Sequence, residues 1–247
     1  MGRRSKTHAS EQQDSPVARA QWDSAPATLP TARPWATVAA LIPFPSWLAG
    51  QTIVDVGAGG SDAVATLLAA GANAFGVDPR YRSFPALVRD VAAYFAAHEA
   101  VGQMPQSHEP SAHPIARQRA AFQHFAASFQ DRRSAAHYRA AVATQLPFAT
   151  DSTDFVYSLD CITQYLDREY ELLVAAVLEA LRVLRSGGRL VLVPFRDDVF
   201  ALGYHPVRQQ NQQRLLQWLQ QVGLHGVVED LSPTGLTGSS RLVIVAR

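Results

Sequence analysis

One stretch of sequence, residues 52–79, constrains the fold more than any other: TIVDVGAGGSDAVATLLAAGANAFGVDP. It begins with a β-branched apolar run at residues 52–56, which is typical of a strand buried on both faces of a parallel sheet. Residues 57–60, Gly-Ala-Gly-Gly, predict a tight turn whose bare N–H groups a ligand can approach. Ser61 is expected to cap a helix, with Asp62 in its first turn complementing the helix dipole.

The same stretch continues through that helix into a second strand. The apolar face of the helix consists of Ala63, Val64, Leu67 and Leu68. Gly71 is placed to end the helix, as glycine commonly does just beyond a helix C-terminus. Residues 74–77 then form a short apolar strand, which brings Asp78 to its carboxyl end.

A glycine turn after one strand and a carboxylate at the tip of its neighbour make a nucleoside-binding arrangement. Ligands of open parallel sheets lie at the carboxyl ends of the strands, beside the point where the strand order reverses. The glycines allow close approach to the backbone, and Asp78 is positioned to accept hydrogen bonds from the two ribose hydroxyls. Such charge-assisted hydrogen bonds contribute about 1.5–3 kcal/mol each.

The identity of the nucleoside depends on the position that follows the glycines. A dinucleotide fingerprint, G-x-G-x-x-G/A, requires a small third residue so that helix and strand pack closely. Counted from Gly57 and Gly59, that position holds Asp62, whose charge would also repel a pyrophosphate. The sequence therefore disfavours a nicotinamide dinucleotide.

Three segments together resemble the class I (Rossmann-like) S-adenosylmethionine (SAM)-dependent methyltransferases. The first is the D-x-G-x-G pattern with an acidic residue after the second strand. The second is LPFATDSTDFVYSLDCITQYLD at residues 146–167, and the third is LEALRVLRSGGRLVLVPF at residues 178–195. The matches cover roughly residues 52–79 and 140–195, in the order and at about the spacing that the family uses. The resemblance implies an α/β fold with a doubly wound, mostly parallel seven-stranded sheet, a C-terminal antiparallel hairpin and helices on both faces.

The resemblance also implies which residues bind SAM. Those on the methionine and ribose side are Asp55, Gly57, Ala58 and Gly59, with Asp78 on the ribose hydroxyls. The expected rim of the adenine site is formed by Thr144, Gln145 and Leu146. The expected floor under the methyl group is formed by Ser158, Leu159 and Asp160. The chain departs from the family pattern at Ser61, which replaces a third glycine, and at Val142, which replaces an acidic residue that contacts adenine.

Methyl transfer from a sulfonium is an in-line displacement that requires mainly alignment of the reactants. An acceptor that carries a proton would also benefit from a general base. Weak candidates for that catalytic role follow the fourth and fifth strands: Asp160, Asp197, Asp198, Tyr204 and His205. Cys161 lies in an apolar-aromatic run without a neighbouring basic residue, which argues against a nucleophilic thiolate.

The rest of the chain is expected to complete the sheet. Residues 139–144, 155–159 and 189–194 are predicted as the third, fourth and fifth strands, and residues 226–229 and 241–246 as the closing hairpin. Helices are predicted at residues 37–41, 169–184 and 209–222. Helical periodicity after Asp78 and again at residues 115–138 predicts a helical insertion between strands 2 and 3, about residues 91–137. The stripe Phe122, Phe125 and Phe129 is interpreted as the core face of that insertion rather than as a cap on the acceptor pocket.

The domain organisation follows from length and composition. At 247 residues with 47% hydrophobic residues, the chain suits one large domain. Residues 1–20 are polar and aperiodic, so we expect a disordered tail before a single domain at residues 21–247. The tryptophans Trp22, Trp35 and Trp47 are interpreted as anchors of an N-terminal extension. The histidine spacings match no metal-ligand pattern, so no metal is expected.

Charge and cysteine content limit which partners and which cellular compartment are expected. A net charge of +1, with no long basic stretch beyond the first residues, gives no support for nucleic-acid binding. The single cysteine fits a reducing cytoplasm. No apolar run is long enough to span a membrane. We therefore expect a cytoplasmic protein with a small-molecule acceptor, whose oligomeric state the sequence does not define.

Two alternatives stay open. One is a methyltransferase-like domain that has lost catalysis and serves as a binding or scaffold module, which Ser61, Val142 and the lack of an evident base favour. The other is a nicotinamide-dependent oxidoreductase, which Asp62 argues against.

Overall fold

The computed structural model describes residues 32–102, 114–195, 206–231 and 240–247. The helices are α2 (Trp35–Leu41), α3 (Ala63–Ala69), α4 (Phe84–Gly102), α5 (Pro114–Gln130), α6 (Tyr170–Val183) and α7 (Pro206–Gln221). Shorter helical turns are η2 (Pro79–Arg82), η3 (Ala135–His137) and the π-helical turn η4 (Ile162–Leu166). The strands are β1 (Thr52–Val56), β2 (Asn73–Val77), β3 (Tyr138–Arg139), β4 (Thr153–Leu159), β5 (Leu184–Phe195), β6 (Gly226–Asp230) and β7 (Ser240–Val245).

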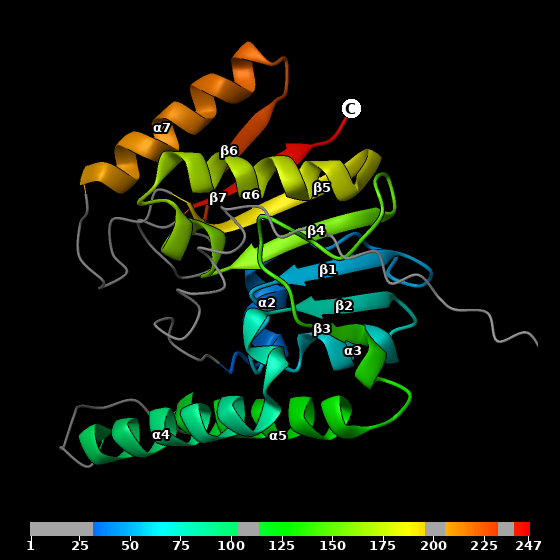
Figure 1. The fold of residues 1–247 in the computed structure, drawn as a ribbon, viewed down its shortest axis with the longest axis vertical. Helices are drawn as coiled ribbons and strands as arrows, with labels where there is room; N and C mark the ends of the chain where they lie inside the picture. Colours follow the sequence, from blue (N-terminus) through cyan, green and yellow to red (C-terminus); the bar gives the residue numbers. More distant parts are fainter. Residues whose placement is uncertain (1–31, 103–113, 196–205, 232–239) are drawn as a thin grey trace, which may run out of the picture.

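The described residues form one seven-stranded sheet in the order β3-β2-β1-β4-β5-β7-β6. Strands β1 to β5 pair in parallel, whereas β7 runs antiparallel to both β5 and β6. In Figure 1 the arrowheads of β1, β2 and β4 point to the same side of the sheet. The strand order reverses between β1 and β4, so the carboxyl ends of these two strands flank the position where open α/β sheets bind ligands.

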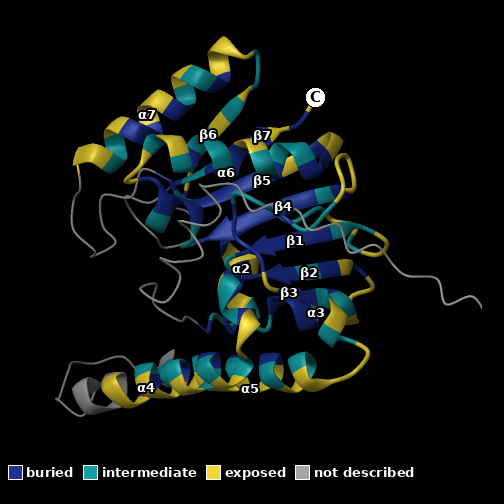
Figure 2. Ribbon diagram, viewed as in Figure 1, coloured by how far each residue is buried: buried dark blue, intermediate teal, exposed yellow. Residues whose placement is uncertain are grey.

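Helices cover both faces of the sheet, which confirms the predicted fold class. Alternate residues of each strand point to opposite faces, so Ile53 packs with α2 to α5 while Val54 packs with α6 and α7. The central strands β1 and β4 are almost entirely buried, whereas the helices expose their outer surfaces (Figure 2). This double covering explains why the central strands read as continuous apolar runs.

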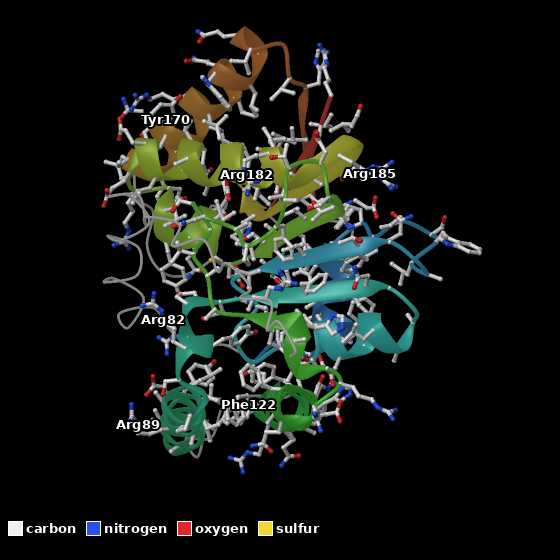
Figure 3. The ribbon with its side chains drawn as sticks, turned by 45° about the vertical axis from the view of Figure 1, so that its right-hand side comes forward. Arg82, Arg89, Phe122, Tyr170, Arg182 and Arg185 are labelled. Atoms are coloured by element: carbon white, nitrogen blue, oxygen red, sulfur yellow. The ribbon has the colours of Figure 1, made fainter. Side chains whose placement is uncertain are left out.

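The insertion between β2 and β3 is an antiparallel pair of helices, α4 and α5. Aromatic side chains fill the space between these helices and the sheet, and Phe122 lies between α4 and α5 (Figure 3). Phe125 is fully buried, with ring centroids 5.3 Å from Tyr138 and 5.6 Å from Phe129. The phenylalanine stripe is therefore a core face, as the sequence indicates.

The N-terminal extension packs on the same face of the sheet. Trp35 packs against Phe44 with 5.2 Å between ring centroids, and Phe44 in turn contacts Tyr157 of β4 at 5.3 Å. Trp35 is thus an anchor, whereas Trp47 is 69% exposed and Trp22 lies outside the described residues.

Some predicted boundaries are wrong. The third strand is only Tyr138–Arg139, because the chain beyond it turns back through a hydrogen bond from Gln145 N to Val142 O. The N-cap residue of α3 is Asp62 rather than the predicted Ser61. Ser61 Oγ nevertheless accepts a hydrogen bond from Ala63 N, the first residue of the helix. The second helix of the insertion ends at Gln130, whereas the helical pattern predicts that it continues to residue 138. Residues 1–20, the expected tail, lie outside the described ranges.

Within the described ranges, no helix is both long enough and apolar enough to cross a membrane.

We predict that Phe125→Ala lowers the free energy of unfolding by about 3–5 kcal/mol, because it removes a fully buried ring and leaves a cavity among aromatic neighbours. Urea denaturation measures this loss. Leu178→Ala, at a position on α6 that is 49% exposed, is the control and should change stability by less than about 0.5 kcal/mol. A loss below about 1 kcal/mol for Phe125→Ala would contradict the assignment of the helix pair to the core.

Candidate functional site

The candidate site lies where β1, β2 and β4 end. The glycine turn follows β1, Asp78 follows β2, and Asp160 and Cys161 follow β4. Because β1 is the neighbour of both β2 and β4 in the sheet, these three segments meet at one edge.

The glycine turn packs directly against the segment after β4. Gly57 has φ +80°, and a Cβ at this position would overlap Cβ and Sγ of Cys161. Gly59 also has a positive φ, of 54°. Only glycine combines this backbone conformation with so close an approach, so the turn and the β4 end are held together without side chains between them.

Asp78 ties the glycine turn to β2. Its Oδ2 accepts a hydrogen bond from Gly59 N at 3.0 Å, and its Oδ1 accepts one from Arg80 N at 2.8 Å. The residue is 8% exposed, and burial raises the pKa of its carboxyl above the usual value. These two amide donors leave further lone pairs on the carboxylate for a ligand.

Asp55 is a second buried carboxyl, on the strand itself. Tyr157, its register partner on β4, donates a hydrogen bond from Oη to Asp55 Oδ2 at 2.8 Å. Burial raises the pKa of Asp55 to about 7, although the hydrogen bond from Tyr157 and the charge of Arg33 act in the opposite direction. Asp55 is therefore a buried group that titrates near neutral pH.

Arg33 is the site residue that sequence reasoning missed. Its Nε lies 3.0 Å from Asp160 Oδ2, and its side chain is only 13% exposed. Its positive charge also favours the ionised forms of Asp55 and Asp78. The N-terminal segment thus brings a cation among three carboxyl groups.

Two hydrogen bonds hold the backbone around Arg33 over the start of α3. Ser61 Oγ donates to Arg33 O at 2.8 Å, and Trp35 N donates to Asp62 Oδ1 at 2.6 Å. Ser61 departs from the methyltransferase pattern and Asp62 from the dinucleotide pattern. Both bind the backbone of the N-terminal segment around Arg33. No motif in the sequence marks Arg33, because its partner Asp160 lies 127 residues away.

The expected adenine rim, Thr144–Leu146, lies in the turn that follows β3. Gln145 pairs with Val142 in an isolated antiparallel bridge, and Leu146 is 4% exposed. Asp78 N donates to Arg139 O at 3.2 Å, which places the end of β3, just before this turn, beside Asp78.

The expected methyl floor, Ser158–Asp160, lies at the end of β4. Ser158 is fully buried and its Oγ accepts a hydrogen bond from Ile162 N, while Leu159 is 3% exposed. Asp160 has φ +53°, and its carboxylate contacts Arg33. Burial raises the pKa of the Cys161 thiol to about 12, so this thiol is not a nucleophile near neutral pH.

The other catalytic candidates, Asp197, Asp198, Tyr204 and His205, lie outside the described residues.

We predict a characteristic pH dependence for Asp55→Asn. Because the pKa of Asp55 is higher in the folded than in the unfolded protein, its contribution to stability is largest below about pH 4. That contribution decreases as the pH rises and is lost once the pH passes about 7. The asparagine lacks this titration, so the stability of the variant relative to the parent protein should rise between about pH 4 and 7. Urea denaturation at several pH values measures the difference.

The control for this prediction is Asp131→Asn. Asp131 is exposed and hydrogen bonds from Ser134 lower the pKa of its carboxyl, so the stability that it contributes is lost only at more acidic pH. A constant difference between Asp55→Asn and the parent protein across the window would contradict the assignment for Asp55.

Comparisons with known proteins agree with the motifs. A family model described as a methyltransferase domain matches residues 108–192, about a third of the chain. No curated protein matches the chain.

Similar solved structures include three methyltransferases. Magnesium protoporphyrin IX methyltransferase from Synechocystis PCC 6803 with bound SAM is 17% identical, over 81% of this chain and 72% of that chain, with a TM-score of 0.44. A putative methyltransferase in complex with the Trm112 methyltransferase activator from Haloferax volcanii is 16% identical, over 93% of both chains, with a TM-score of 0.48. A SAM-dependent methyltransferase from Aquifex aeolicus is 12% identical, over 81% of this chain and 84% of that chain, with a TM-score of 0.44.

Likeness at these identities and TM-scores carries no argument about activity. The family match falls on the segment that contains α5, β4, α6 and most of β5, and the sequence motifs lie at the carboxyl ends of β1, β2 and β4. In its motifs, its methyltransferase-domain match and its sheet order, the chain resembles the class I SAM-dependent methyltransferases, whose cofactor is SAM.

Proposed function

We propose that the protein is a SAM-dependent methyltransferase that acts on a small-molecule acceptor in the cytoplasm. The observation that carries this proposal is the convergence of the glycine turn, Asp78 and Arg33 at the point where the strand order reverses. The net charge of +1 supports a small acceptor rather than a nucleic acid, and the single cysteine supports a reducing compartment.

The residues at this edge suit each polar part of the cofactor. Asp78 has lone pairs left for the two ribose hydroxyls, because only two amides occupy it. Arg33 offers a guanidinium to the methionine carboxylate, and Asp55 and Asp160 offer negative charge to the methionine ammonium. Thr144–Leu146 would border the adenine, and Gly57–Gly59 would face the methionine chain.

When bound, SAM supplies an electrophilic methyl group. The contribution of this chain to the reaction is alignment of the cofactor and the acceptor in a site from which water is excluded. Asp160 is paired with Arg33 in this structure, which supports a positioning role for Asp160 more than a role as general base. A role as general base for Asp197, Asp198, Tyr204 or His205, which follow β5 in the sequence, is still a hypothesis.

A second function is a binding or scaffold module without catalysis. The ion pair between Arg33 and Asp160 favours it, because this pair engages in a structural contact the one candidate base that lies within the described residues. The two functions differ in turnover: an active enzyme releases S-adenosylhomocysteine in the presence of an acceptor, and a scaffold does not.

We predict that Asp78→Ala weakens the binding of SAM at least about tenfold, because the ribose hydroxyls lose a charged acceptor. Isothermal titration calorimetry measures the affinity. Asp131→Ala is the matched control, since Asp131 also accepts hydrogen bonds from nearby backbone amides but lies on an exposed turn. Unchanged affinity in a folded Asp78→Ala variant would refute the proposed site.

We also predict that Arg33→Met weakens binding of S-adenosylhomocysteine about tenfold or more, because a charged hydrogen bond to its carboxylate is lost. Binding of 5′-methylthioadenosine, which has no carboxylate, should change much less. Equal losses for the two ligands would show that Arg33 acts through the fold rather than through the carboxylate.

A further inference from the structure

The segment at residues 144–150, between β3 and β4, is held in place by side chains of α6. Apart from the bridge at Gln145, it contains no helix or strand. Glu179 Oε1 accepts a hydrogen bond from Leu146 N at 2.6 Å. Arg182, three residues further along α6, donates to Phe148 O at 3.0 Å and to Thr150 Oγ1 at 3.2 Å. Figure 3 labels Arg182 on α6.

Glu179 and Arg182 also bind each other, and the pair acts as one clamp. Arg182 Nε lies 2.7 Å from Glu179 Oε2, and its terminal nitrogen lies 2.8 Å from Oε1. The hydrogen bond that Arg182 donates to Glu179 raises the pKa of Arg182. Two parallel charge-assisted hydrogen bonds fix the orientation of both planar groups, which an isolated surface ion pair would not do.

Arg139, at the end of β3, binds the same segment. It donates to Pro147 O at 2.8 Å, and its guanidinium lies 4.7 Å from the ring centroid of Phe75 and 4.9 Å from that of Phe148. Arginine side chains therefore bind the successive carbonyls of residues 146–148. Side chains replace the backbone ladder that a helix or strand would provide.

Arg139 connects the clamped segment to Asp78. Arg139, whose carbonyl accepts the hydrogen bond from Asp78 N, also binds the segment.

We propose that Glu179 and Arg182 are positioning residues that hold residues 144–150 as the wall against the base of the cofactor and thereby set its affinity and its preference for adenine. This inference rests on the proposed function, because it assigns a role at the same site. Neither residue contacts the base. Glu179 acts through Leu146 N, and so fixes the backbone of the segment that is expected to border the base.

The test compares Glu179→Leu, Glu179→Gln and the parent protein by calorimetry with two ligands. These are S-adenosylhomocysteine and its inosine counterpart, in which an oxo group replaces the amino group of the base. Glu179→Leu should weaken S-adenosylhomocysteine at least about tenfold and reduce the preference for adenine, because Leu146 N loses its acceptor. Glu179→Gln keeps an acceptor oxygen and should retain most of both properties.

The matched control is Glu229→Gln, which removes the charge from the ion pair between Glu229 and Arg241 on the hairpin of β6 and β7. It should leave both affinities unchanged. If Glu179→Leu does not fold, Arg182→Lys provides the same test, because lysine keeps the charge but cannot bridge Glu179, Phe148 and Thr150 together.

Hydrogen exchange at Leu146 N, together with urea denaturation, distinguishes a loosened segment from a destabilised fold. Faster exchange at Leu146 with a reduced base preference supports the proposal. Unchanged affinities in Glu179→Leu, or equal losses for the two ligands, would overturn it while the proposed function stands. Failure of the parent protein to bind either ligand would instead refute the proposed function and, with it, this role of the clamp.

Discussion

The close approach of the glycine turn to the end of β4 is the constraint on which the rest of the site depends. A Cβ at Gly57 would overlap Cys161, so β1 and β4 can end side by side only with glycine at this position. The same turn offers Gly59 N to Asp78, which joins the ends of three strands. The parallel sheet brings the carboxyl ends of the strands to one edge, and the glycine turn holds the residues at that edge close together.

Buried charge is the second organising feature. Asp55 and Asp78 lie in the interior, where desolvation opposes their ionisation, and the charge of Arg33 favours the ionised form of both, together with hydrogen bonds and, for Asp78, the charge of Arg80. Because Arg33 comes from the segment before α2, the N-terminal extension completes the site rather than only covering the sheet. The pair that it forms with Asp160 connects the extension to the end of β4.

The sequence predicts the local parts of this arrangement well and the distant pairings poorly. The bounds of β1 follow from a β-branched run that ends at a glycine, and β2 and α3 follow from apolar periodicity to within a residue or two. The position of Asp78 follows from the same pattern. These are short-range signals that need no knowledge of the rest of the chain.

The sequence does not indicate contacts between segments that lie far apart along the chain. Arg33 is part of no motif. Glu179 has the pattern of an ordinary polar residue on an amphipathic helix, although it binds Leu146 N. The apolar run at residues 139–144 predicts a longer third strand than the structure has, because the backbone bridge between Val142 and Gln145 turns the chain back. Arg33 and Glu179, by contrast, are placed by side-chain hydrogen bonds to distant segments.

The most direct test of the account is the position of S-adenosylhomocysteine in a crystal structure of the complex. We predict that both ribose hydroxyl oxygens lie within hydrogen-bonding distance of the Asp78 carboxylate, at about 2.5–3.0 Å, beside the glycine turn. A ligand bound elsewhere on the protein, or one at this edge of the sheet with its ribose turned away from Asp78, would contradict the account.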